Sequence, residues 1–489
     1  MGTKAQTTVQ TISGTVHGVA DGDLVRFRGI PYAAAPVGEL RFAAPAAHPG
    51  WTGVRDASRP GPTPLLPPSS LDSSIPEPTT PGEEILNLSI TAPREVDSSA
   101  PVYVWIHGGS YVAGTPNGGW FDGATLARSG VIVVAITYRL GFDGFGHIPH
   151  APDNRALLDA LAALRWVQDN IGQFGGDPSR VTLGGQSAGG GMVLALLAAP
   201  PAQGLFRAAI AHSAPLPDIR IADAHQVTAE LARELGIGPA LEQWRRISRA
   251  DIVAAERRLK AGSVWSDLAQ LRGVLSRQRP LTRFGPVVDT ELVGLPLAAL
   301  AAPDTRPLLL GTTAAEYNLV TTDLDPAFLR GAARPALAAL GVPSALARAY
   351  PRAYPTLSTA HLLGQALTNR AFRMSAIQVA QARARAGIPA GLWDFRWHGA
   401  VGPARHCIDL PFAWDVLDGE RVDRIAGEHP PRELAREMSG DIAEFIGTGT
   451  VPWPGFTAAA PTAKVYDTPS WLGRDPYRFE RLALDPTVL

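Results

Sequence analysis

The stretch Gly184-Gly185-Gln186-Ser187-Ala188-Gly189-Gly190-Gly191 joins a short apolar run to a longer one. The short run is typical of a buried strand, and the longer run is typical of a helix. A serine with glycine two positions before it and two positions after it, at a sharp turn from strand to helix, is the pattern of a nucleophile elbow. Side chains at Gly185 and Gly189 would collide where the strand and the helix meet. We therefore predict that Ser187 is a nucleophile whose hydroxyl is lifted clear of the main chain.

Two other interpretations of this glycine-rich run compete with the elbow. Glycine and serine are common in loops, so an ordinary loop is one of them. A phosphate-binding loop is the other, and it would need Lys followed by Ser or Thr after the last glycine. Met192 and Val193 stand there instead, which argues against phosphate binding.

A second glycine pair follows a strand-like run at residues 102–106, in the segment His107-Gly108-Gly109-Ser110. Acyl transfer builds negative charge on a carbonyl oxygen, and backbone N–H groups aimed at that oxygen stabilise the charge. Glycine lets the chain approach the oxygen closely. We predict that the amides of Gly108, Gly109 and Ala188 form an oxyanion hole. An ordinary turn after a strand is the alternative for the glycine pair.

Segments along most of the chain are similar to one known family. The chain resembles the type-B carboxylesterases, the carboxylesterase and cholinesterase branch of the α/β-hydrolases. Besides the elbow, the segments that carry the resemblance are residues 27–33, 36–42, 51–57, 137–141, 157–159 and 165–178. The resemblance extends from about residue 10 to past residue 450, and it is weakest over residues 220–300 and 320–390.

This resemblance implies an α/β-hydrolase fold, with a mostly parallel central sheet flanked by helices. It implies one domain over residues 1–489, in which residues 216–305 and 326–388 form helical lid insertions. We expect residues 10–60 to form small antiparallel strands that start the sheet. Helices are expected at residues 124–129, 157–174 and 433–446.

A serine hydroxyl needs a general base, and the base needs a carboxylate that orients it. In this fold the order along the chain is Ser, then Asp or Glu, then His. Glu316 follows an apolar run that ends in glycine, and it matches the family's Gly-Thr-x-x-x-Glu segment. We predict that Glu316 is the acid, with a carboxylate at the start of a helix as its alternative role. The rival carboxylates have turn-like surroundings and are Asp304, Asp323 and Asp325.

His406 is the predicted base. It precedes Asp409-Leu410-Pro411-Phe412, which resembles the family's block His-Gly-x-Glu/Asp-Leu-Pro-Phe. His398, at the end of a strand-like run, is the alternative. Cys407 stands where the family has glycine, so we expect an altered loop there. The resemblance also implies that Ser213 supports the acid, with a turn-capping serine as the alternative.

Two further expectations concern side chains near these segments. Five aromatic residues are candidates for an apolar substrate pocket, although each could equally belong to the core: Tyr111, Trp120, Phe121, Phe412 and Trp414. The family also carries a buried ion pair, and Arg41 and Glu83 align with its two members.

Composition limits the partners. The formal net charge is −1, so the charge of the chain gives no reason to expect a nucleic-acid partner or binding to an anionic membrane. The single cysteine, Cys407, rules out an intrachain disulfide and a thiolate zinc site, and no His-Glu-x-x-His segment is present. We therefore expect no metal and no cofactor. The polar first residues and the lack of a long apolar run predict a cytoplasmic enzyme, as a monomer or a homodimer.

Together these observations predict a serine carboxylesterase. It would cleave a small-molecule carboxylic ester to acid and alcohol through an acyl-enzyme intermediate on Ser187. An amidase or carbamate hydrolase with the same three residues remains an alternative. A non-catalytic binding module is a further alternative, but such relatives generally lack one of the three residues.

Overall fold

The computed structural model describes residues 3–4, 7–66, 75–96, 99–259, 267–288, 290–294, 304–322, 324, 331–399 and 402–485. Two of the rival carboxylates, Asp323 and Asp325, lie outside these residues. Parts of both expected insertions lie outside them as well.

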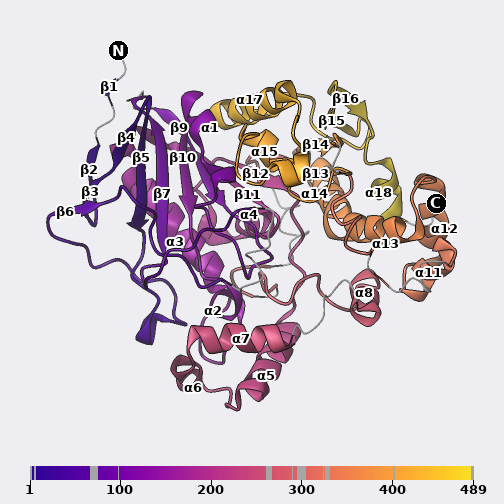
Figure 1. Ribbon diagram of the computed structural model, residues 1–489, viewed down its shortest axis with the longest axis horizontal. Helices are drawn as coiled ribbons and strands as arrows, with labels where there is room; N and C mark the ends of the chain where they lie inside the picture. The colour runs from indigo at the N-terminus through magenta and orange to yellow at the C-terminus, as the bar shows by residue number, and fades with distance from the viewer. Residues whose placement is uncertain are drawn as a thin grey trace.

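The described part of the chain is organised around an eleven-stranded sheet with the order β16-β15-β14-β13-β12-β11-β9-β10-β7-β5-β4 (Figure 1). Neighbouring strands from β10 through β15 pair in parallel, and the strands at both edges pair antiparallel. The strands are β4 (Val19–Asp21), β5 (Leu24–Pro31), β7 (Asn87–Pro93), β9 (Ala100–Ile106), β10 (Ile132–Ile136), β11 (Gly176–Gln186), β12 (Ala208–His212), β13 (Leu308–Thr313), β14 (Gly391–Phe395), β15 (Thr462–Tyr466) and β16 (Trp471–Arg474).

The central strands are mostly apolar and are buried along their whole length, because helices cover both faces of the sheet. Every residue of β10, β12, β13 and β14 is buried. A parallel sheet buried on both faces needs such continuous runs of valine, isoleucine, leucine and alanine. The mostly parallel sheet flanked by helices agrees with the fold class predicted from the sequence.

Two small sheets lie outside the main one in the part of the chain that the structure describes. β1 (Thr3–Lys4) pairs with β8 (Glu95–Val96), while β2 (Thr8–Thr11) and β6 (Val54–Asp56) flank β3 (Gly14–His17). The expectation that residues 10–60 start the main sheet is therefore wrong for β2, β3 and β6, and right only for β4 and β5. The β3–β6 pair is also parallel rather than antiparallel.

The helices that pack near the sheet include the three expected from sequence. α1, α3 and α17 occupy these segments, with boundaries that differ by a few residues from the expected ones. The helices of this group are α1 (Ala124–Arg128), α2 (Gly141–Phe145), α3 (Arg155–Asn170), α4 (Ala188–Ala198), α15 (Leu410–Ala413), α16 (Asp423–Ala426), α17 (Arg432–Thr448) and α18 (Arg478–Ala483). Within the described residues, no helix is long and apolar enough to cross a bilayer.

The two expected insertions are helical where the structure describes them. The first contains α5 (Ile221–Leu235), α6 (Leu241–Arg246), α7 (Arg249–Leu259) and α8 (Leu268–Leu275). The second contains α11 (Ala333–Ala339), α12 (Ser344–Ala353), α13 (Thr359–Thr368), a π-helical turn (Asn369–Arg373) and α14 (Met374–Arg385). In Figure 1, α5–α7 lie below the sheet, and α11–α13 lie at the side of the molecule away from β4 and β5. Their boundaries as insertions and their role as lids stay predictions.

The expected ion pair between Arg41 and Glu83 is absent from the described structure. Arg41 instead pairs with Asp143 of α2, with Nε 3.3 Å from Oδ2, and donates to the carbonyl oxygen of Ile247. Glu83 is exposed on its loop. The prediction was wrong because α2 places a closer carboxylate beside the guanidinium.

A different buried ion pair joins the segment after β10 to α3. The Arg139 guanidinium donates to Asp159 at 2.6 Å and 2.9 Å, and the Arg139 backbone N–H donates to the same carboxylate at 3.1 Å. The two side chains are 1% and 0% exposed. Arg139 also donates to the carbonyl oxygen of Ala43 at 2.7 Å, so the pair fixes three segments at once.

We expect Asp159→Asn to lower the free energy of unfolding by about 3–5 kcal/mol, because it leaves the Arg139 charge buried without its counter-charge. Urea unfolding followed by circular dichroism measures this change. The matched control is Asp23→Asn, whose carboxylate pairs with Arg128 at 3.0 Å in solvent and should leave the midpoint nearly unchanged. Equal midpoints for the two variants would contradict this account of the buried pair.

Candidate active site

Ser187 occupies a strained turn between β11 and α4. β11 ends at Gln186 and α4 begins at Ala188, so a single residue makes the turn. Ser187 has φ 54° and ψ −120°, a conformation that costs free energy for any residue with a side chain. Its N–H donates to the carbonyl oxygen of His212 at 2.9 Å, and its own carbonyl oxygen accepts from Gly191 at 2.9 Å. These two backbone bonds hold the turn in place.

The two glycines of the elbow are required by packing. A Cβ added to Gly185 would lie 2.6 Å from the carbonyl carbon of Gly189. A Cβ added to Gly189 would lie 2.1 Å from the carbonyl oxygen of Ile106 in β9. Both contacts are with backbone, which cannot move aside easily, so the collision expected from the sequence is present.

His406 connects Ser187 to Glu316. Its Nε2 lies 3.0 Å from Ser187 Oγ, and its Nδ1 lies 2.5 Å from Glu316 Oε2. A carboxylate beside Nδ1 keeps the proton on that nitrogen, which leaves the Nε2 lone pair free to accept the serine proton. The structure therefore brings together the three side chains that the sequence analysis selected. His398 is exposed, and Asp304 pairs with Arg306 at 2.5 Å.

Glu316 is held by two further donors. Its Oε1 accepts from Ser213 Oγ at 2.6 Å and from the Thr313 N–H at 2.8 Å. Because Oε2 faces His406, both carboxylate oxygens are occupied and the group cannot rotate freely. Ser213 thus lies where a residue supporting the acid would be needed.

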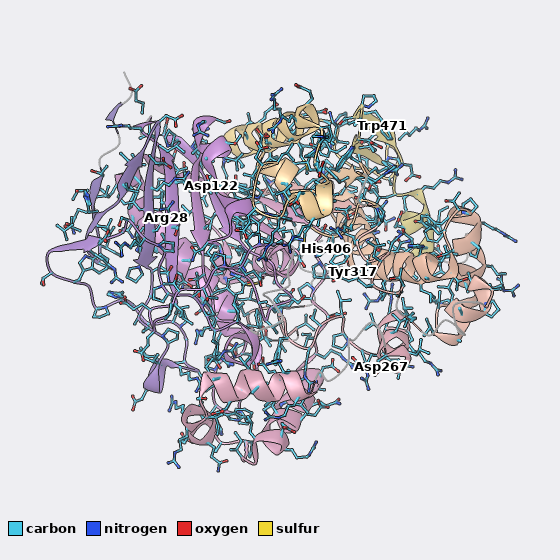
Figure 2. The ribbon with its side chains drawn as sticks, in the orientation of Figure 1. Arg28, Asp122, Asp267, Tyr317, His406 and Trp471 are labelled. Carbon is cyan, nitrogen blue, oxygen red and sulfur yellow. The ribbon has the colours of Figure 1, made fainter. Side chains whose placement is uncertain are left out.

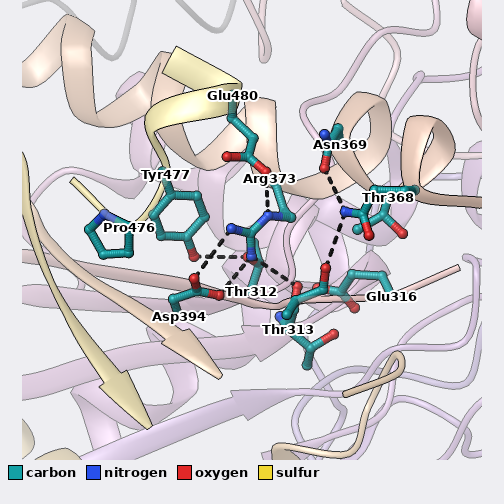
Figure 3. Close-up of polar contacts among 12 residues, drawn as sticks. Thr312, Thr313, Glu316, Thr368, Asn369, Arg373, Asp394, Pro476, Tyr477 and Glu480 are labelled. Atoms are coloured by element: carbon teal, nitrogen blue, oxygen red, sulfur yellow. Dashed lines mark hydrogen bonds and ion pairs between the residues drawn. The ribbon is translucent and has the colours of Figure 1, made fainter. Parts of the chain in front are cut away.

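A buried charge cluster supports the strand that precedes Glu316 (Figure 3). Arg373 donates to Glu480 at 2.6 Å and to Asp394 at 2.7 Å, and it also donates to the carbonyl oxygen of Thr313 at 3.3 Å. Thr313 is the residue whose N–H holds Glu316. Sequence reasoning missed this cluster, because its members come from the π-helical turn, β14 and α18, and share no motif.

Aromatic side chains hold the imidazole of His406 from two directions. The Phe372 ring is stacked on it at 4.8 Å between centroids, and the Tyr317 ring meets it edge-on at 5.5 Å. Figure 2 shows Tyr317 beside His406 near the centre of the molecule. Tyr317 follows the predicted acid directly, but Phe372 lies in the π-helical turn, and no sequence signal identified it.

Cys407 takes the backbone conformation that glycine favours. Its φ is 71°, in the left-handed region, so the chain keeps the shape of a glycine loop at some cost in strain. Cys407 Sγ accepts from Gln186 Nε2 at 3.1 Å, and the same Nε2 lies 3.3 Å from His406 Nε2. We expected an altered loop at this position. The structure instead keeps a glycine-like backbone there, and only the side chain differs.

The electrostatic surroundings favour the charged form of His406. Burial lowers the pKa of His406, but Cys407 and Glu316 outweigh burial and raise the pKa well above its ordinary value. His107, in contrast, has its pKa lowered to about 4 by burial. Its Nδ1 lies 2.8 Å from the carbonyl oxygen of Gly108, and its ring stacks on Tyr138. His107 is therefore neutral and serves to hold the glycine segment.

A cavity of about 140 Å³, which we call the active-site cavity, opens beside Ser187 and His406. Gly108 and Gly109 form part of its wall. Neither of their backbone N–H groups donates a hydrogen bond to another described residue, so both are free for a substrate oxygen. Ala188, the third predicted donor, is the first residue of α4, where backbone N–H groups have no partner within the helix.

The five candidate pocket residues divide between the cavity and the core. Phe121 lines the active-site cavity. Trp120 and Trp414 belong to the hydrophobic cluster on one side of the sheet, together with Phe412. Tyr111 packs edge-on against Phe145. Apart from Phe121, the structure places these rings in the core, which was the alternative given for each of them.

Comparison with known proteins identifies the family. A family model described as the carboxylesterase family matches residues 3–458. The para-nitrobenzyl esterase of Bacillus subtilis (strain 168) is 34% identical over 98% of each chain. The fumonisin B1 esterase of Sphingopyxis macrogoltabida is 33% identical over 91% of this chain and 84% of its own.

Solved structures give the same result. The carboxylesterase EST55 of Geobacillus stearothermophilus superposes with a TM-score of 0.84 at 32% identity, covering 98% of this chain and 100% of its own. A structure of PNB esterase has a TM-score of 0.84 at 31% identity, covering 98% and 99%. The agreement of sequence and structure over nearly the whole length leaves one conclusion: this chain belongs to the carboxylesterase family, has the α/β-hydrolase fold, and hydrolyses carboxylic esters.

Proposed function

We propose that Ser187, His406 and Glu316 carry out ester hydrolysis in this chain. The observation that carries the proposal is the unbroken set of contacts from Ser187 Oγ through His406 to Glu316, at 3.0 Å and 2.5 Å. Such an arrangement activates a serine without a metal or a cofactor. Within the described residues, no group of three or more possible ligands could hold a metal ion.

In the first step, Ser187 Oγ attacks the ester carbonyl carbon, and its proton passes to His406 Nε2. The carbonyl oxygen becomes negatively charged, and the amides of Gly108, Gly109 and Ala188 are the donors that would stabilise it. The carbon–oxygen bond to the alcohol then breaks, and His406 returns its proton to the departing oxygen. The acyl group is left on Ser187.

In the second step, water replaces the alcohol. His406 takes a proton from water, whose oxygen attacks the acyl carbon. The bond to Ser187 Oγ breaks, and the proton on His406 restores the serine hydroxyl, so the free acid leaves and the enzyme is regenerated. Glu316 stabilises the imidazolium each time it forms. Phe372 and Tyr317 pack against the His406 ring and hold its orientation.

The substrate is a small-molecule carboxylic ester. Phe121 and Tyr317 line the active-site cavity, which favours an apolar group beside the ester carbonyl. Trp414 would support this wall, because its ring meets that of Phe121 edge-on at 6.0 Å between centroids. Trp120, Phe412 and Tyr111 are buried in the core. The lid role of the two helical segments, the cytoplasmic location and the monomeric or dimeric state stay predictions.

Ser187→Ala should lower kcat for p-nitrophenyl acetate by more than ~10⁴, because it removes the nucleophile. The purified variant should keep the circular dichroism spectrum and melting temperature of the parent. Ser129→Ala, which alters an exposed serine, is the matched control and should keep full activity. A loss of about a thousandfold or less in Ser187→Ala would point to another nucleophile. A parent enzyme without turnover would favour the binding-module alternative.

The pH dependence of kcat/KM should follow the protonation of His406, which acts as a base only when neutral. Glu316 helps to raise the pKa of His406, so Glu316→Gln should move the rise of kcat/KM to lower pH. It should also lower kcat by about 10⁴, because the imidazole is no longer held in the required tautomer.

Asp304→Asn is the control for this pH experiment, since it alters a rival carboxylate that pairs with Arg306. Its pH profile should match that of the parent. If the rise of kcat/KM stays in place in Glu316→Gln but moves in Asp304→Asn, the acid has been assigned to the wrong residue.

Matched ester and amide substrates separate the esterase from its alternative. We expect p-nitrophenyl acetate to be cleaved orders of magnitude faster than p-nitroacetanilide, because an amine leaving group needs fuller protonation by His406. Steady-state rates of the two substrates at equal concentration give the ratio. A ratio near one would favour the amidase or carbamate hydrolase.

A further inference from the structure

A second cavity, of about 680 Å³, lies where the N-terminal segment meets α2 and the start of α7. We call it the arginine cavity, because the side chains of Arg41, Arg245 and Arg249 form part of its wall. None of the described residues that line it also lines the active-site cavity. Its volume is several times larger than that of the active-site cavity, so it can hold a small organic molecule.

Four arginines and two carboxylates are among the described residues that line the arginine cavity: Arg41, Arg139, Arg245, Arg249, Asp143 and Glu83. Among the described residues, Arg245 is the arginine of this wall that has no carboxylate partner, since Arg139 pairs with Asp159 and the other two pair with Asp143. Asp143 is a half-buried carboxylate on its wall, and it is shared between Arg41 at 3.3 Å and Arg249 at 3.5 Å. Glu256, which lies behind the wall, is a second carboxylate 3.9 Å from Arg249 Nη1. Glu83 also lines the cavity, but it is exposed. Arg245 donates to the backbone carbonyl of Glu39 at 2.8 Å, which satisfies one donor without neutralising the charge.

Several guanidinium donors here are not satisfied by the described part of the chain. Among the described residues, Nη1 and Nη2 of Arg249 and Nε of Arg245 are buried and have no hydrogen-bond acceptor, although Nη1 of Arg249 is within ion-pair distance of two carboxylates. Buried polar atoms are nearly always hydrogen-bonded, so each exception needs an explanation. An oxyanion can accept several such bonds at once, and the planar guanidinium fork matches a carboxylate in particular.

The mouth of the arginine cavity is apolar. Val37 and Leu65 line it and are 41% and 48% exposed, which places them among the large apolar side chains that this chain leaves in solvent. Pro64 and Leu66 adjoin them on the same wall. A ligand that met both the arginines and this mouth would therefore need one charged end and one apolar end.

We propose that the arginine cavity binds an amphipathic carboxylate. Its carboxylate lies against Arg245 and Arg249, and its apolar part lies against Val37 and Leu65. The site is separate from the three residues proposed for ester hydrolysis and does not depend on their roles. The acids released by ester hydrolysis belong to the same chemical class, so a product or a related acid can occupy it.

Calorimetric titration with octanoate tests this site. The parent enzyme should bind octanoate, and the double variant Arg245→Gln/Arg249→Gln should bind it about tenfold more weakly or worse, as expected when charge-assisted hydrogen bonds are lost. Any octanoate that enters the active-site cavity binds both proteins equally and appears as the binding left in the variant. Arg257→Gln on the same helix, α7, is the matched control and should bind as the parent does.

Two further ligands test the two ends of the proposed molecule. Inorganic phosphate lacks the apolar end and 1-octanol lacks the charge, so both should bind much more weakly than octanoate. Binding of either ligand as tight as that of octanoate overturns the proposal, as does equal octanoate binding by the parent and the double variant. Absence of octanoate binding to the parent also overturns it, and leaves water as the partner of the buried donors.

A variant at the mouth keeps the test valid if the double variant fails to fold. Leu65→Glu changes a half-exposed side chain and should weaken octanoate binding by charge repulsion and loss of apolar contact. Ile12→Glu, at an apolar residue that is 70% exposed elsewhere, is its control and should leave binding unchanged. Unchanged octanoate binding in Leu65→Glu would contradict the proposed orientation.

Discussion

The parallel register of four strands determines where the candidate active site can form. Gln186, His212, Gly311 and Trp393 are paired in one row across β11, β12, β13 and β14. Because the strands run in the same direction, the segments that leave this row all emerge at one edge of the sheet. Ser187 and Ser213 follow the row directly, and the loops carrying Glu316 and His406 follow β13 and β14. The contact between His406 and Glu316 at 2.5 Å is thus a consequence of register as much as of local sequence.

Two buried carboxylates near this edge of the sheet, Asp394 and Glu316, have different kinds of partner. Burial raises the pKa of Asp394, but Arg373 and Arg396 outweigh burial. The net result is a pKa below its ordinary value, so this carboxylate stays ionised. Its charge is matched permanently by an arginine, which cannot lose its proton. Glu316, in the loop that follows β13, faces a histidine whose charge can change. The ion pair of Asp394 with Arg373 therefore holds the backbone in place. The pair of Glu316 with His406 is the one that can take part in proton transfer.

The sequence predicted the parts of the site that follow from main-chain geometry. A serine between close-packed glycines, a glycine pair after a strand, and the order of acid and base along the chain all have local signals. Phe372 and Arg373 had none, because a π-helical turn in an alanine-rich helical segment brings them to His406 and β13. The split of the N-terminal strands between two sheets was also beyond prediction, since pairing partners of short exposed strands depend on distant segments.

Cys407 and Arg41 show what a family resemblance transfers and what it does not. Cys407 keeps a φ of 71° where the family has glycine, at a cost of about 1–2 kcal/mol, because the surrounding loop and the contact with Gln186 determine the backbone. Arg41 keeps its position but not its expected partner, since Asp143 lies nearer than Glu83. Backbone conformation is fixed by many neighbours at once, whereas the partner of a long charged side chain can change when a single carboxylate comes closer. Residue roles that depend on backbone geometry therefore transfer between relatives more safely than roles that depend on one ion pair.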